Sequence, residues 1–234
     1  MKKYKLKKRG VLLGSIFLAV TIIIMIIILT TRNIIMQKRL SNEVDRLTAM
    51  NIMTDKYDTK IQAKGNYGKI EKAIKFYLKD YSDSLQEVIR IINDEKLQKI
   101  LSAENYKNDG PEFKNTIAYL EETQKSFNEN MNKLVKLSEK EEIMKYIKRE
   151  KLDKYYTKLY QNYMFDEGIE TNIKDSQLQL EATTNSINNL IYIDLEVIRF
   201  LIANKDEWKV EEDAIVFYKE SLLNRYNELV SKIK

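Results

Sequence analysis

The sequence contains no cysteine and no histidine. Their absence excludes a Ser-His-Asp triad, a Cys-His pair, a histidine-ligated catalytic zinc and a structural zinc site. A domain without disulfides has to rely on the packing of its core. We therefore expect no metal, no cofactor and no catalysis of these kinds.

Glycine and proline are also scarce, with six glycines and one proline in 234 residues. No GxxxxGK or GxGxxG motif is present, so we expect no nucleotide to be bound. Gly10 and Gly14 lie near the N-terminus, and the remaining breakers fall at Gly65 and Gly68, at Gly110-Pro111 and at Gly168. The long stretches between them lack both residue types, which predicts helices.

The longest apolar run extends from Val11 to Thr31 and contains no charge. A helix of about 20 such residues would cover the roughly 30 Å hydrocarbon core of a bilayer. The run exceeds the usual length of a cleaved signal peptide's apolar region, so it predicts a retained, single-pass signal-anchor. The residues expected to flank the membrane and to contact its lipid headgroups are Lys2, Lys3, Lys5, Lys7, Lys8 and Arg9.

The positions of the basic residues predict orientation and partners. Positive charge tends to stay cytoplasmic, so we expect residues 1–10 to form a cytoplasmic tail and the C-terminal domain to be extracytoplasmic, with the inverted topology as the alternative. The chain has 40 basic and 35 acidic residues, and without the six basic residues of the tail the remainder is nearly neutral. A nearly neutral body predicts no nucleic-acid binding.

Helical periodicity predicts the rest of the fold. Residues 32–64 contain no breaker until their end and predict a juxtamembrane helix continuous with the anchor. Apolar stripes then recur in residues 70–92 and 113–134, and Ser138 with Glu141 resembles a capping box that restarts a helix. The most hydrophobic stretch after the anchor, about Asp175–Ala203, is the expected central helix.

Near the C-terminus the apolar period changes from helical to alternating. Trp208 and Val210, then Ile215 and Phe217, flank a polar stretch, which predicts a short β-hairpin near residues 207–217, with an irregular loop that buries Trp208 as the alternative. The predicted fold class is thus all-α: a transmembrane helix, then an elongated antiparallel helical bundle over residues 65–234 that carries this small ribbon.

An aromatic cluster is the first candidate for function. Tyr155, Tyr156, Tyr160 and Tyr163 lie close together in sequence and predict an interaction surface for a sugar or peptide. The competing interpretation, which the spacing favours, is a helix whose tyrosines face the core with their hydroxyls at its rim.

Acidic residues supply two further candidates. Residues 166–170, DEGIE, contain carboxylates but lack the spacing of a calcium loop, which favours a solvated turn. Asp194 and Glu196 could serve as the acid and base of a glycosidase, but they point to different faces of a helix. An ion pair between Glu196 and Arg199, three residues apart, is the favoured interpretation.

These observations favour a non-catalytic bacterial cell-envelope protein, anchored in the lipid bilayer, whose helical domain is a scaffold or protein-interaction module. Its expected partners are other envelope proteins or a second copy, joined in a coiled coil of juxtamembrane helices. The first alternative is an extracytoplasmic ligand-sensing bundle that works with a separate signalling partner. The second is a carboxylate-dependent cell-wall hydrolase.

Overall fold

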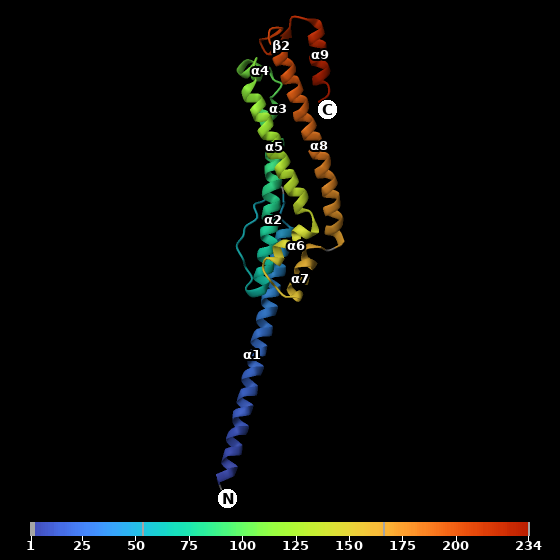
Figure 1. The fold of residues 1–234 in the computed structure, drawn as a ribbon. Coiled ribbons are helices and arrows are strands. Elements are labelled where there is room, and N and C mark those ends of the chain that lie inside the picture. Colours follow the sequence, from blue (N-terminus) through green and yellow to red (C-terminus); the bar gives the residue numbers. More distant parts are fainter. Residues whose placement is uncertain (1–2, 53, 166, 234) are drawn as a thin grey trace.

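The shaft of the molecule consists of the long helices α2 (Gly65–Ile92), α5 (Lys114–Leu137) and α8 (Glu167–Ala203), which run side by side in alternating directions (Figure 1). The computed structural model describes the backbone of residues 3–52, 54–165 and 167–233, and the side chains of residues 25–52, 54–165 and 178–233. In α5 the residues Leu120, Phe127, Met131 and Leu134 recur at helical spacing and are all buried. Packing of such apolar stripes against one another holds α2, α5 and α8 together.

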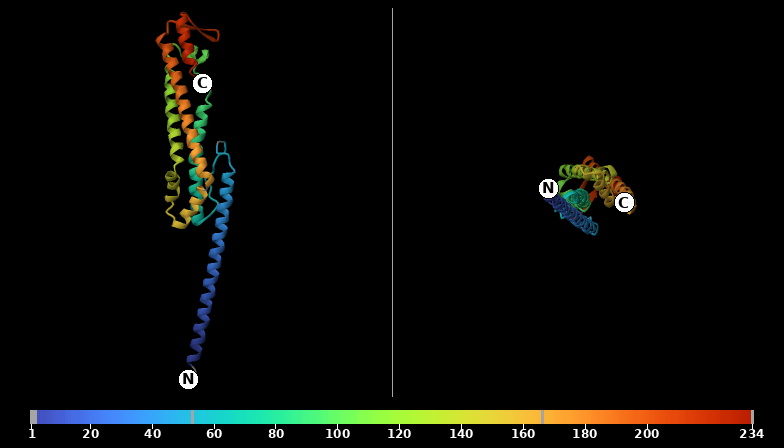
Figure 2. Two further views of the ribbon diagram at one scale, coloured as in Figure 1. Left: turned by 90° about the vertical axis from the view of Figure 1, so that its right-hand side faces the viewer. Right: turned by 90° about the horizontal axis from the view of Figure 1, so that it is seen from below.

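Helix α1 (Lys3–Thr48) projects from one end of this shaft, and only its C-terminal part lies beside α2 (Figures 1 and 2). Leu40, Val44 and Leu47 are buried there, at the i, i+4, i+7 spacing of a single helix face. Residues 54–64, here called the return segment, run back along α1 to the start of α2. Helices α1 and α2 therefore run in the same direction, and the extended return segment connects the end of α1 to the start of α2.

The predicted transmembrane anchor requires correction. Within the part of the chain whose side chains are described, no helix is both long and apolar enough to cross a membrane. Most of the run Val11–Thr31 lies outside that part, and from Met25 onwards α1 soon meets Arg32, Lys38 and Arg39, each costly in hydrocarbon. The single-pass, signal-anchor topology and the extracytoplasmic placement depended on that span, and they are corrected with it.

The predicted juxtamembrane helix over residues 32–64 is also too long, because α1 ends at Thr48. The Asp55 carboxylate accepts a hydrogen bond of 2.9 Å from the backbone N–H of Asn51 and closes a turn there. Beyond it the chain is extended, and its backbone amides bind a buried carboxylate of α2. That tertiary contact outweighs local helix propensity.

The far end of the shaft carries the smaller elements: α3 (Glu95–Gln98), α4 (Ala103–Asp109), β1 (Trp208–Glu211), β2 (Ala214–Phe217) and α9 (Glu220–Val230). The strands confirm the predicted hairpin, with Trp208 opposite Phe217. The Trp208 ring stacks on Phe113 at 5.9 Å, and its Nε1 donates a 2.8 Å hydrogen bond to the Leu201 carbonyl oxygen. Burial of this apolar face stabilises a ribbon that would be marginal alone.

Helices α6 (Lys140–Lys148) and α7 (Lys154–Met164) fold back beside α1 and α2. The chain restarts a helix after Leu137 as expected, but no capping box forms. The Ser138 hydroxyl instead donates a 2.9 Å hydrogen bond back to the Leu134 carbonyl oxygen, and Glu139 is the residue that precedes α6. The fold is thus mostly helical with a two-stranded sheet.

Candidate functional site

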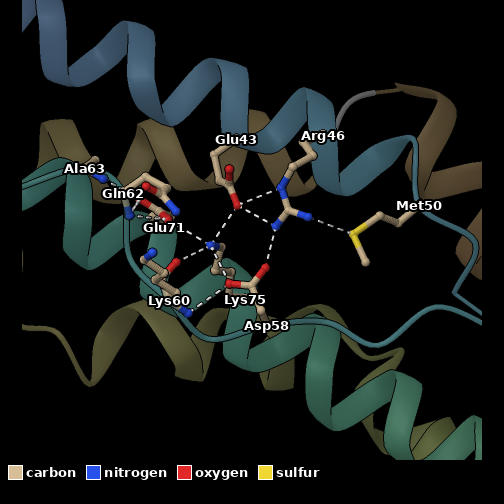
Figure 3. A network of polar contacts seen from close by, with 9 residues as sticks. All are labelled: Glu43, Arg46, Met50, Asp58, Lys60, Gln62, Ala63, Glu71 and Lys75. Carbon is tan, nitrogen blue, oxygen red and sulfur yellow. Dashed lines mark hydrogen bonds and ion pairs between the residues drawn. The ribbon is translucent and has the colours of Figure 1, made fainter.

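Charged side chains from separate segments meet where α1 lies against α2 (Figure 3). Helix α1 contributes Glu43 and Arg46, the return segment contributes Asp58, and α2 contributes Glu71 and Lys75. We call these residues the junction cluster. They lie beside the apolar core formed by α1, α2, α6 and α7.

Lys75 lies at the centre of the junction cluster, and its side chain is fully buried. Its Nζ is 2.7 Å from Glu43 Oε1 and 3.0 Å from Glu71 Oε1. Asp58 Oδ1 lies 3.3 Å away, and the Lys60 carbonyl oxygen accepts a further hydrogen bond. An ammonium has three donors, so its hydrogen-bonding capacity is satisfied without water.

The Glu71 carboxylate is held by backbone amides as well as by Lys75. The Gln62 N–H lies 2.8 and 2.9 Å from its two oxygens, and the Ala63 N–H donates to Oε2 at 2.7 Å. Charge-assisted hydrogen bonds of this kind are stronger than neutral ones. They fix the end of the return segment against the first turns of α2.

Arg46 closes the solvent side of the junction cluster. Its Nε and Nη2 donate to Glu43 Oε1 at 3.1 and 2.6 Å, and Nη2 also donates to Asp58 Oδ2 at 2.8 Å. Nη1 lies 3.4 Å from the Met50 sulfur. The guanidinium therefore joins the end of α1 to the middle of the return segment.

The electrostatic environment favours the charged forms of Glu43 and Lys75. Burial raises the pKa of Glu43, but hydrogen bonds from Arg46 and Lys75 outweigh it and hold that pKa below its usual value. Burial lowers the pKa of Lys75, whereas its hydrogen bonds to Glu43 and Glu71 raise it above normal. The shifts stabilise the charged forms, which is typical of a structural ion cluster and unlike a proton-transfer site.

The sequence contained a signal for this cluster that periodicity alone does not reveal. Glu71 and Lys75 have i, i+4 spacing and adjoin Ile70 and Ile74 in the apolar stripe of α2. Charges next to a core stripe indicate a buried pair when a second segment supplies partners. Those partners, from α1 and the return segment, are distant in sequence.

The predicted tyrosine surface does not form one exposed platform. Tyr160 is fully buried, and its hydroxyl donates a 2.9 Å hydrogen bond to the Ile143 carbonyl oxygen. Tyr156 and Tyr163 pack partly buried against the same core, while Tyr155 is exposed. The arrangement agrees with core-facing tyrosines.

The predicted acidic pair of the central helix is divided between the interior and the surface. Asp194 is 3% exposed and lies near Tyr106, whose hydroxyl is 2.9 Å from that of Tyr226. Glu196 accepts a 2.9 Å hydrogen bond from the Tyr192 hydroxyl in place of the predicted pair with Arg199. Burial raises the pKa of Asp194 to about 7.

Two candidate sites from the sequence fall outside the described side chains. They are the acidic residues 166–170 and the basic residues 2–9. In the part of the chain that is described, no group of acidic residues is arranged to hold a metal ion.

Comparison with known proteins gives one partial likeness. Residues 80–195 match the family model described as "Insect allergen related repeat, nitrile-specifier detoxification". The match begins inside α2, ends inside α8 and covers slightly less than half of the chain. Neither the curated proteins nor the solved structures include a match. The junction cluster lies outside the matched residues.

Proposed function

We propose that this protein is a non-catalytic helical scaffold, in which a stiff rod presents α1 at one end and the hairpin region at the other. The observation that carries the proposal is the junction cluster. Buried ion pairs of Lys75 with Glu43 and Glu71 connect α1 to α2, and Lys75 also contacts the return segment through the half-exposed Asp58 and the Lys60 carbonyl oxygen. Such contacts oppose bending of α1 against the shaft.

The energetic cost of opening the junction supports a stiff connection. Removing one partner of a buried ion pair typically costs about 3–5 kcal/mol, because the remaining charge is left uncompensated. The apolar contacts of Leu40, Val44 and Leu47 would be lost in the same motion. A hinge at this position would therefore be rarely open, which suits a protein that holds partners at a set separation.

Distance measurements between two spin labels test the scaffold. Because the chain has no cysteine, Asn33→Cys and Asp213→Cys create unique attachment points on exposed residues near opposite ends. Double electron–electron resonance should give one narrow distance distribution. Adding Lys75→Ala should broaden it.

Lys72→Ala is the matched control, because Lys72 lies on the same helix but makes an exposed ion pair with Glu150. This control should leave the distribution narrow. A broad distribution in the otherwise native chain would contradict the scaffold.

A further inference from the structure

The part of α1 that projects beyond the junction exposes apolar side chains. Met25, Ile26 and Leu29 are exposed on several sides of the helix. Ile27, Ile28, Ile34 and Ile35 lie on the side roughly opposite to that of Leu40, because a helix advances about 100° per residue, and beyond Leu29 the exposed large apolar side chains of α1 continue on that side. Their exposed fractions are 57% for Ile27, 60% for Ile28, 66% for Ile34 and 45% for Ile35. We call these isoleucines the outer stripe.

Neighbouring exposed apolar side chains on a helix mark an interaction surface. A partner helix that buries such a stripe contributes residues at i, i+3, i+4 and i+7. The projecting part of α1 extends beyond the end of the shaft (Figure 1), and the outer stripe is exposed there, so a partner can reach it without opening the junction.

The charges beside the outer stripe indicate the chemistry of the partner. Arg32, Lys38 and Arg39 are exposed and form no ion pair with any described residue. Between residues 25 and 42 the sequence has no acidic side chain. A second copy in the same register would bring like charges together, whereas an acidic partner would neutralise them.

We propose that the outer stripe of α1 binds an amphipathic helix of another protein, whose apolar face is flanked by Asp and Glu. This inference rests on the proposed scaffold and names the partner for its α1 end. Burial of the isoleucines supplies the affinity, and pairing with Arg32, Lys38 and Arg39 supplies the selectivity.

A pair of synthetic peptides tests the selectivity. One is an amphipathic helix with a leucine stripe flanked by glutamates, and the other has lysines in place of the glutamates. Fluorescence anisotropy with the full chain should show about tenfold tighter binding of the glutamate peptide at low salt, with the difference falling as salt rises. Equal affinity for the two peptides would overturn the proposal.

Variants of the outer stripe test the surface itself. Ile34→Ser with Ile35→Ser should weaken binding of the glutamate peptide about tenfold or more, because the apolar area is lost. Leu178→Ser is the matched control, since Leu178 is 61% exposed on α8 and should not matter. Lys38→Glu with Arg39→Glu should reverse the preference toward the lysine peptide.

Light scattering provides the last arm of the test. Self-association of the full chain that is abolished by Ile34→Ser with Ile35→Ser, without any preference for the glutamate peptide, would assign the stripe to a second copy and overturn the proposal. Peptide binding is independent of the distance distribution between the spin labels. Failure of this inference can therefore be distinguished from failure of the scaffold.

Discussion

Replacing Asp194 by asparagine is expected to remove most of the dependence of stability on pH between pH 5 and pH 8. Asp194 is 3% exposed and forms no hydrogen bond or ion pair within the described part of the chain. Burial disfavours its charged form and raises its pKa from 3.8 to about 7. Because the chain has no histidine, few other side chains titrate in this window.

The sign of the effect follows from the proton balance. Between the two pKa values the folded chain keeps a proton on Asp194 that the unfolded chain has lost, so stability falls as pH rises from about 4 to about 7 and then levels off. The full shift corresponds to about 4 kcal/mol at 1.36 kcal/mol per pKa unit. About 2–3 kcal/mol of it should be lost between pH 5 and pH 8.

Urea unfolding at pH 5 and at pH 8 measures this difference in the native chain and in Asp194→Asn. Asparagine has the shape of the protonated acid and cannot ionise, so the variant should gain about 2–3 kcal/mol relative to the native chain on going from pH 5 to pH 8. Glu196→Gln is the control, because Glu196 is partly exposed on the same helix. An equal pH dependence in the native chain and in Asp194→Asn would refute the reasoning.

Two further substitutions test the interior. Lys75→Ala should lower the free energy of unfolding by about 3–5 kcal/mol, because two buried carboxylates lose their cation. Lys72→Ala should change it by less than about 1 kcal/mol. Urea unfolding compares the two variants, and equal effects would contradict a buried cluster. Tyr160→Phe should cost about 1–2 kcal/mol, because a buried backbone carbonyl loses its donor, whereas Tyr155→Phe should be neutral. Thermal melting distinguishes them, and an unchanged melting temperature for Tyr160→Phe would show that this hydrogen bond contributes nothing.

The sequence predicted those elements whose structure follows from the periodicity and breakers of a single segment. The stripe of α5 specifies one buried face by its spacing alone, and Gly110-Pro111 marks the break before it. The alternation of Trp208, Val210, Ile215 and Phe217 is likewise local, and it predicted the hairpin, whose register the structure supplies. Such patterns depend on the helical and strand periods, which need no partner segment.

Periodicity failed where distant segments compete for the chain. Residues 49–64 contain no glycine and no proline, which predicts a helix, yet the return segment is extended. Its amides bind Glu71, which local sequence does not reveal. The predicted pair between Glu196 and Arg199 is wrong as well: Glu196 accepts a hydrogen bond from Tyr192 on the same helix and lies 4.0 Å from the ammonium of Lys232, which is distant in sequence.

The sequence by itself determined that this is a mostly helical chain without the side chains for thiol or histidine chemistry, because composition and periodicity are local properties. Only the tertiary structure decided where α1 ends, that Lys75 lies in a buried junction cluster, and that Asp194 is shielded from water. Burial and charge pairing are set by segments far apart in sequence. The same packing leaves the outer stripe of α1 uncovered, and so decides which surface is free to meet a partner.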